Sequence, residues 1–168
     1  EYSICIMSGN FVQRGNTSIV NKWVKTEMAL KSGIDLVLEL PTVYSISSAE
    51  NFAEGAIKLL NSLKIVDTVS FGSENSDIDI LNRFSGILYE EPKQYVEFLN
   101  EELKKGLSFP KARENAILLY LNDQKYSNIL NQPNNTLAIE YLKALYKTSS
   151  KIKAFFIKRQ GAGYNDTN

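Results

Sequence analysis

The feature that most constrains the fold of this chain is an alternation of short apolar runs with longer amphipathic segments. Each run has the length of a buried strand, and turn residues or a proline follow the first three. The runs are Tyr2–Met7, Asp35–Leu40, Val66–Phe71 and Lys151–Lys158. Strands that alternate with helices favour a mostly parallel sheet covered on both faces. We therefore predict an α/β fold in which these four strands are parallel neighbours.

The segments between the runs carry helical periodicity and recognisable helix ends. Asn21 suits the N-cap of the first helix, and Gly33 suits its C-terminal end. Ser47 and Glu50 form a capping-box pattern that opens the second helix. Helices are predicted over Lys22–Ser32, from Ser47 to about Lys64, over 77–88, 92–105 and 111–122, and from 132–135 to about Lys147. A helical segment of about 77–147 is thus expected before the last strand.

Composition excludes several kinds of site. The 168 residues contain no histidine and one cysteine, Cys5, which rules out Ser-His and Cys-His pairs, the usual zinc ligand sets and an intrachain disulfide framework within this chain. Nineteen basic and nineteen acidic side chains give a net charge of zero, so total charge does not indicate a nucleic-acid partner, although a local basic face remains compatible with it. No apolar run approaches the ~20 residues of a membrane span.

The chain opens on Glu1 and enters its first strand directly. We expect a fragment with a segment missing upstream, and residues 1–7 show no secretory leader. A βα unit feeding into Tyr2–Met7 would contain the first strand of the sheet, so we expect the domain to be stable only with that unit or with a swapped partner. The polar, glycine-rich stretch at 161–168 is typical of a loop or linker.

Small, polar and cationic residues follow three of the four predicted strands. In parallel sheets, ligands bind outside the carboxyl ends of the strands. Backbone N–H groups in turns and an arginine fork are suited to phosphate or ribose. The residues concerned are Ser8, Gly9 and Asn10, then Gly72, Ser73 and Glu74, then Lys158, Arg159 and Gln160. Their convergence at one edge predicts a nucleotide site.

Each of these signals also has a purely structural interpretation. The glycines Gly9 and Gly15 match neither the P-loop nor the dinucleotide fingerprint, and their pattern favours a surface turn over a phosphate-binding loop. Gly72 fits a plain strand end as well as a ligand contact, and Lys158 and Arg159 fit a solvated pair as well as a phosphate site. Asn134 and Asn135 after Pro133 favour a helix cap over a ligand contact. The lysines of the first helix, Lys22, Lys25 and Lys31, favour a solvated face over an RNA contact.

Several motifs in the same order resemble the bacterial tRNA(Met) cytidine acetate ligase family. They run through nearly the whole chain. The motifs are Met7-Ser-Gly-Asn-Phe-Val-Gln-Arg-Gly15, Lys22-Trp23, Met28-Ala-Leu30, Gly33-Ile-Asp-Leu-Val-Leu-Glu-Leu-Pro41, Ala49-Glu-Asn-Phe-Ala53, Phe71-Gly-Ser-Glu74 and Gln132-Pro-Asn-Asn135. The resemblance implies a Rossmann-like nucleotidyltransferase domain that binds ATP and spans residues 1–168, with its first strand missing.

The resemblance also implies roles for individual residues. It places Gly72, Asn134 and Arg159 at ATP. The positions after the strand ends add Ser8, Gly9, Lys158 and Gln160 as further pocket residues. No catalytic residue and no metal ligand is predicted within the chain, because the family's His-x-Gly-His signature would lie upstream of Glu1. The chain by itself is therefore expected to be inactive. Arg159→Lys in the intact protein is expected to weaken ATP binding, since lysine keeps the charge but loses the fork.

The function implied is that of a cytoplasmic ligase without a membrane partner. It would use ATP, with Mg²⁺ expected, to activate acetate as acetyl-adenylate and then acetylate N4 of the wobble cytidine of elongator tRNA(Met). Two alternatives remain open, namely another nucleotidyltransferase that makes an adenylylated small product and a non-catalytic RNA-binding module. The sequence predicts no oligomeric state.

Overall fold

The computed structural model describes residues 1–75 and 77–159. The chain divides into two compact units, Glu1–Val66 and Asp67–Asn168, which we call the N-terminal unit and the C-terminal unit. Within the described ranges, no helix is long and apolar enough to cross a membrane.

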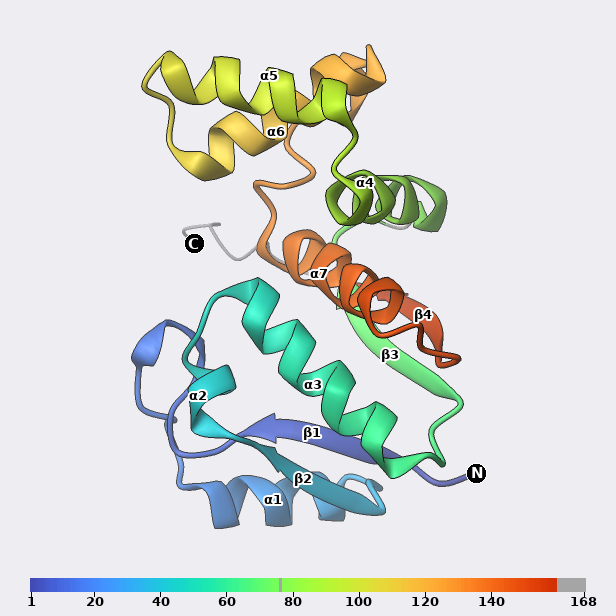
Figure 1. Cartoon of the computed structure of the whole chain (residues 1–168). Coiled ribbons are helices and arrows are strands. Elements are labelled where there is room, and N and C mark those ends of the chain that lie inside the picture. Colours follow the sequence, from blue (N-terminus) through green and yellow to red (C-terminus); the bar gives the residue numbers. More distant parts are fainter. Residues whose placement is uncertain (76, 160–168) are drawn as a thin grey trace. The chain divides into compact units, whose positions relative to one another are not determined.

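The N-terminal unit is built on two parallel strands, β1 (Ile4–Ser8) and β2 (Leu36–Leu40), paired from Ile4 with Leu36 to Ser8 with Leu40. Helices α1 and α3 lie on opposite sides of this pair (Figure 1). The helical elements are η1 (Gln13–Gly15), α1 (Lys22–Lys31), α2 (Thr42–Ser45) and α3 (Ala49–Leu63). The buried apolar side chains of α3 are Ala53, Ala56, Ile57 and Leu60.

The helix ends of this unit test the predicted caps. Asn21 Oδ1 accepts a hydrogen bond from the N–H of Val24 at 3.0 Å, so the predicted cap of α1 is confirmed. The predicted capping box is wrong by one residue, because the N-cap of α3 is Ser48, whose Oγ accepts from the N–H of Asn51 at 3.3 Å. Ser47 instead accepts from the Asn51 side chain at 2.8 Å.

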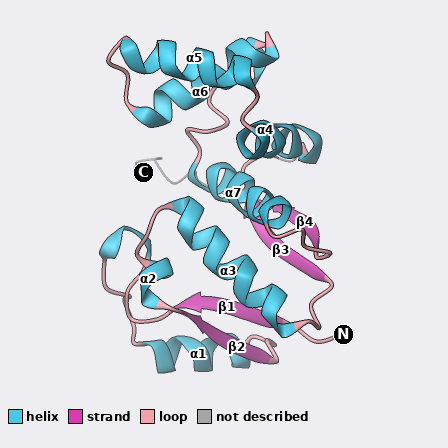
Figure 2. Cartoon of the chain, in the orientation of Figure 1, coloured by secondary structure: helices cyan, strands magenta, loops and turns pink. Residues whose placement is uncertain are grey.

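The C-terminal unit pairs β3 (Thr68–Ser73) with β4 (Lys153–Lys158), again in parallel. In the described part of this unit, the helices lie between these two strands in sequence. Figure 2 draws these helices in cyan and the two strands in magenta. They are α4 (Ile78–Glu90), α5 (Lys93–Lys104), α6 (Phe109–Leu121), η2 (Gln124–Tyr126) and α7 (Pro133–Lys147). The predicted helical segment before the last strand is therefore present.

Helix α7 packs on β3 through aromatic rings. The ring of Phe71 lies 4.9 Å from that of Tyr141 on α7 and 4.7 Å from that of Phe156 on β4, measured between centroids. Burial raises the pKa of Tyr141 to about 12. Helix α4 adds Leu81 and Phe84, both fully buried, to the apolar interior. This packing holds β3 against α7.

The predicted α/β class with parallel strands is confirmed, with shifted strand bounds. The third strand begins and ends two residues later than predicted, so that Gly72 and Ser73 belong to β3 itself. Ser8 likewise belongs to β1. In the described part of the chain, strand ladders join β1 to β2 and β3 to β4. That all four strands are neighbours in one sheet, and that residues 1–168 form one domain, remain predictions.

Candidate functional site

The carboxyl end of β3 is bonded to the first turn of α7 by buried polar groups. The Ser73 hydroxyl donates to Oδ1 of Asn135 at 2.7 Å, and the same oxygen accepts from the N–H of Asn75 at 2.8 Å. The Asn135 amide donates in turn to Oε1 of Gln132 at 2.6 Å. Ser73 and Asn135 are fully buried, and buried polar groups need such partners. These contacts fix the end of the strand against the helix.

Glu74 caps α7 with its carboxylate. Its Oε2 accepts from the N–H of Asn135 at 2.7 Å, and its Oε1 accepts from both the N–H and Nδ2 of Asn134, at 3.2 and 2.5 Å. A carboxylate at this position satisfies unpaired N–H groups of the first turn and suits the helix dipole. The cap interpretation of Asn134 and Asn135 is therefore wrong: both lie inside α7, and Glu74 caps them.

Gly72 and Arg159 lie side by side on the other face of the β3–β4 pair. Side chains alternate along a strand, and both neighbours of Gly72 contact α7, so position 72 faces away from that helix. A Cβ on Gly72 would lie 3.3 Å from Cγ of Arg159. The N–H of Arg159 donates to the Ser73 carbonyl at 3.0 Å, which extends the ladder past the end of β4. The missing side chain at 72 thus makes room for the stem of the arginine.

An open cavity of about 540 Å³ lies at this end of the two strands. Glu74, Asn75 and Asp77 line it from the β3 side, and Lys158 lines it from the end of β4. The remaining lining comes from residues 125–129 and Gln132, between η2 and α7. A volume of this size is typical of small-molecule sites.

Two cations line the cavity, Lys125 and Lys158, and they differ in their partners. Lys125 pairs with Asp123 at 3.3 Å and lies 4.6 Å from the centre of the Tyr126 ring. Its contacts with Tyr126 and then Asp123 raise the pKa of Lys125. Within residues 1–75 and 77–159, Lys158 and Arg159 have no ion-pair partner. Two adjacent exposed cations without a counter-charge suit an anionic ligand.

The structure brings some of the predicted site residues together. A side chain at position 72 would meet the Arg159 stem, Lys158 lines the cavity, and Asn134 is bonded to Glu74, which also lines the cavity. Ser8 and Gly9 belong to the N-terminal unit, where the Gly9 carbonyl accepts from Lys25 Nζ at 3.1 Å. Gln160 lies outside the described residues. No group of three or more His, Cys, Asp or Glu side chains among those described is arranged to hold a metal ion.

Sequence reasoning missed the wall formed by residues 125–129. This stretch is a short 3₁₀ turn followed by a polar loop, and it carries no periodic pattern. The one available signal was Asp123, two residues before Lys125, which suits a turn cap; its carboxylate accepts from the N–H of Lys125 at 3.0 Å. That backbone hydrogen bond is also the main cause of the lowered pKa of Asp123.

Comparison with known proteins identifies the family of this chain. The model of the family described as HIGH Nucleotidyl Transferase matches residues 1–168, the whole chain. The chain belongs to this family.

Among curated relatives, the chain is 53% identical over 170 residues to the tRNA(Met) cytidine acetate ligase of Clostridium perfringens, strain ATCC 13124, covering 97% of the chain and 42% of the relative. It is 57% identical over 164 residues to the protein of that name from Thermoanaerobacter sp. strain X514, covering 98% and 41%. The chain thus spans about two fifths of the length of these relatives.

Solved structures also match this chain. The apo crystal structure of Thermotoga maritima TmcAL aligns with a TM-score of 0.96 at 43% identity, over 99% of this chain and 40% of that one. The structure of the same protein bound with alpha-thio ATP aligns with a TM-score of 0.91, over 95% and 40%. The nucleotidyltransferase-like fold of this chain is therefore established by comparison.

Proposed function

We propose that the protein containing this chain is an ATP-dependent tRNA(Met) cytidine acetate ligase. The observation that carries the proposal is the identity of 53–57% to curated relatives of that name over nearly all of the chain. Binding of an ATP analogue by Thermotoga maritima TmcAL, with the same fold, supports a nucleotide as the ligand. The cavity and the exposed cations at the ends of β3 and β4 offer that ligand a site.

The proposed reaction has two balanced steps. Acetate oxygen attacks the α-phosphorus of ATP, the bond to the β-phosphate breaks, and acetyl-adenylate and pyrophosphate form. The N4 amino group of the wobble cytidine of elongator tRNA(Met) then attacks the acetyl carbon, and AMP and a proton leave. Mg²⁺ is proposed to arrive on the phosphates of ATP, as is usual for nucleotide substrates. The proposed location is the cytoplasm, where tRNA is found.

In this scheme the described residues bind and orient the nucleotide. Lys158 and Arg159 supply positive charge to phosphate oxygens, and the arginine does so as a two-pronged donor. Gly72 lets the ligand and the arginine stem approach the strand closely. Asn134, with Nδ2 donating to Glu74, keeps Oδ1 to accept a hydrogen bond from a ribose hydroxyl or a base amino group. Ser8, Gly9 and Gln160 are kept as proposed pocket residues, and the catalytic histidines are proposed to lie upstream of Glu1.

The direct test is product analysis with the full-length protein. Incubation with ATP, labelled acetate and elongator tRNA(Met) should release pyrophosphate and place label on N4 of cytidine in digested tRNA. A labelled adenylate that accumulates and never reaches tRNA would indicate another nucleotidyltransferase instead. RNA binding without pyrophosphate release would support the non-catalytic alternative.

The binding roles are tested by calorimetry on the full-length protein. Arg159→Lys should weaken ATP binding about tenfold, because a bidentate contact with a charged group is reduced to a point charge. Lys153→Met is the matched control, since Lys153 is an exposed cation at the opposite end of β4. Equal ATP affinity in wild type and Arg159→Lys would remove Arg159 from the site.

A further inference from the structure

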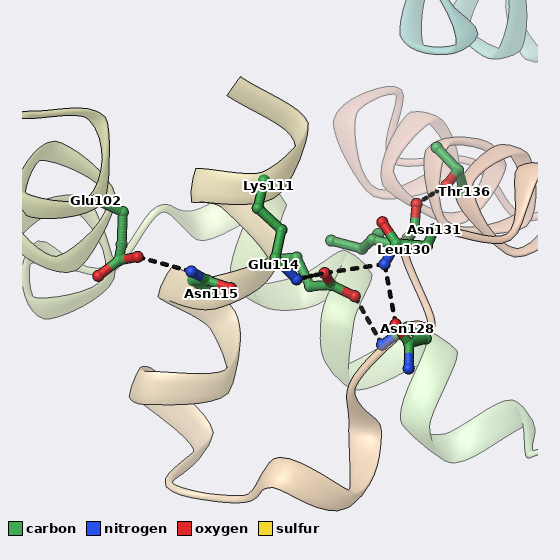
Figure 3. Close-up of polar contacts among 8 residues, drawn as sticks. All are labelled: Glu102, Lys111, Glu114, Asn115, Asn128, Leu130, Asn131 and Thr136. Carbon is green, nitrogen blue, oxygen red and sulfur yellow. Dashed lines mark hydrogen bonds and ion pairs between the residues drawn. The ribbon is translucent and has the colours of Figure 1, made fainter. Parts of the chain in front are cut away.

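The cavity wall between η2 and α7 is held by one fully buried carboxylate. Glu114, in the first half of α6, has an exposed fraction of zero. Its Oε1 accepts from the N–H of Asn128 at 2.7 Å, and its Oε2 accepts from Nδ2 of Asn131 at 3.2 Å and from Lys111 Nζ at 2.7 Å. Figure 3 shows this carboxylate between α6 and the loop.

The segment that Glu114 contacts, residues 127–132, is also the segment that lines the cavity. Ser127, Asn128, Ile129 and Gln132 all contribute to the lining. Asn128 adopts a left-handed conformation with φ of 71°, which costs energy for a residue with a side chain, although least for asparagine. The hydrogen bond from its N–H to Glu114 opposes relaxation of that turn. The hydrogen bonds to Glu114 on α6 therefore fix both the conformation and the position of this cavity wall.

Further contacts join the same segment to the first turn of α7. The Asn131 amide donates to Oδ1 of Asn128 at 3.1 Å, and the Thr136 hydroxyl donates to the carbonyl of Leu130 at 2.8 Å. Both contacts are drawn in Figure 3. The loop therefore bridges α6, through Glu114, and the helix whose N-terminus is capped by Glu74. A shift at Glu114 is transmitted to the cavity.

Stability alone does not account for this carboxylate. Removing a charge from water is costly, and a buried ion pair is often no more stabilising than a well-packed apolar pair. What three directed hydrogen bonds provide, and an apolar side chain does not, is one fixed geometry for the loop. We propose that Glu114 is a positioning residue for nucleotide binding: it fixes the 127–132 loop as a wall of the cavity without touching the ligand.

The chain supplies a matched control on the neighbouring helix. Glu102 of α5 is 5% exposed, accepts from Nδ2 of Asn115 on α6 at 2.7 Å, and pairs with Lys105 at 2.5 Å. Like Glu114, Glu102 is a buried carboxylate with a lysine partner, and it contacts α6, the helix that carries Glu114. Its contacts do not include the 127–132 loop. Figure 3 shows both carboxylates in one view. Glu114→Gln and Glu102→Gln therefore both neutralise a buried, paired carboxylate. Only Glu114→Gln changes contacts with the 127–132 loop.

The experiment measures ATP affinity by calorimetry, and kcat and KM for ATP, in the full-length protein well below the melting temperature of each variant. Both substitutions should lower Tm. Glu114→Gln should in addition weaken ATP binding and raise the KM for ATP by about tenfold, with kcat at saturating ATP near that of wild type. Glu102→Gln should keep ATP affinity within about twofold of wild type.

Two further variants keep the result decisive. Asn131→Ala, which removes one Glu114 contact, should weaken binding less than Glu114→Gln, and the double variant should bind no more weakly than Glu114→Gln alone. If Glu114→Gln does not fold, Glu114→Asp takes its place, and a shortened carboxylate that cannot reach both asparagines should give the same split between affinity and kcat.

The inference rests on the proposed nucleotide site, and the outcomes separate the two. ATP binding by wild type that is weakened by Arg159→Lys but equal in Glu114→Gln and Glu102→Gln would overturn the role of Glu114 alone. A loss of kcat without a change in affinity would do the same. Absence of ATP binding by the wild-type protein would overturn the proposed site together with this inference.

Discussion

The two units of the chain use their apolar and charged residues differently. In the N-terminal unit, helix α1 has no buried residue, and Trp23 is 73% exposed while Ile19 is fully exposed. In the C-terminal unit, α4 alone buries Ile80, Leu81 and Phe84.

Charged groups follow the same division. Among the residues that the structure describes, the buried carboxylates are Glu102, Glu114 and Glu140; all three belong to the C-terminal unit, and each has a cationic partner within it. The charged pairs of the N-terminal unit, such as Lys22 with Glu39, are partly or largely exposed. The C-terminal unit thus builds its cavity from its own packed and paired side chains. Four predictions test this contrast between the units.

The largest effect is expected from truncating one aromatic residue in each unit. Phe84→Ala should lower the free energy of unfolding by about 3–5 kcal/mol, because a fully buried ring is lost and a cavity remains. Trp23→Ala should change it by less than about 0.5 kcal/mol, because that ring is already in solvent. Denaturant unfolding of the two variants checks this. Comparable losses would show that α1 is packed in the working protein.

Next in size is the loss of a helix cap in each unit. Glu74→Ala should cost about 2 kcal/mol, because it leaves the first turn of α7 without its acceptor in a partly buried place. Asn21→Ala should cost about 1 kcal/mol, as for an exposed cap. Thermal unfolding measures both. The stability of Glu74→Gln, which keeps one oxygen, should fall between those of Glu74→Ala and wild type. A larger loss of stability in Asn21→Ala than in Glu74→Ala would contradict the comparison of the two units.

A smaller effect on stability is expected at Gly72. Gly72→Ala should cost less than about 1 kcal/mol, since only a few tenths of an ångström of movement by Arg159 relieves the contact. ATP affinity should nevertheless fall, because the arginine stem and the ligand meet the strand at this position. Calorimetry and thermal unfolding on the same samples separate the two effects. A change in stability without a change in affinity would place the ligand elsewhere.

The smallest effect is the dependence of stability on pH. Hydrogen bonds from the N–H and hydroxyl of Ser3 lower the pKa of Asp35, and those from Lys105 and Asn115 lower the pKa of Glu102. A carboxyl whose pKa is lower in the folded state stabilises the fold above its unfolded pKa, and this contribution is lost as the pH falls through the folded pKa. The loss should therefore appear below about pH 4.

Carboxyl NMR titration should find both midpoints below the ordinary range. Asp35→Asn and Glu102→Gln should each flatten the acid limb of stability against pH, the second more strongly because its carboxylate is buried. If Asp35→Asn flattened the acid limb as much as Glu102→Gln or more, the exposure of the carboxylate would not be what makes the pH dependence of the two units differ.

The parts of the structure that the sequence predicted are those with a local pattern. Four apolar runs identified four strands, and Asn21 identified a helix start. The end of the third strand was misplaced because Gly72 and Ser73 resemble turn residues, although Ser73 is buried against Asn135. The family resemblance indicated Gly72 and Arg159 as site residues; the stem of Arg159 lies where a side chain at position 72 would lie, and their role at ATP stays a prediction.

The walls of the cavity had no local pattern to predict them. The stretch 124–132 is polar and irregular, and its conformation is set by contacts with distant helices. Glu114 lies in the sequence Lys111-Ala-Arg-Glu114, which is typical of an exposed helix face, yet its side chain is fully buried. Only tertiary packing shows that this carboxylate meets Asn128 and Asn131, fourteen and seventeen residues later.

A crystal structure of the full-length protein with a non-hydrolysable ATP analogue tests the proposed site most directly. We expect the nucleotide at the carboxyl ends of β3 and β4, with its phosphates at Lys158 and Arg159 and its nucleoside beside Gly72 and Asn134. The 127–132 loop should keep its contacts with Glu114. A nucleotide bound away from all four of these residues would contradict the central claim that the C-terminal unit carries the site.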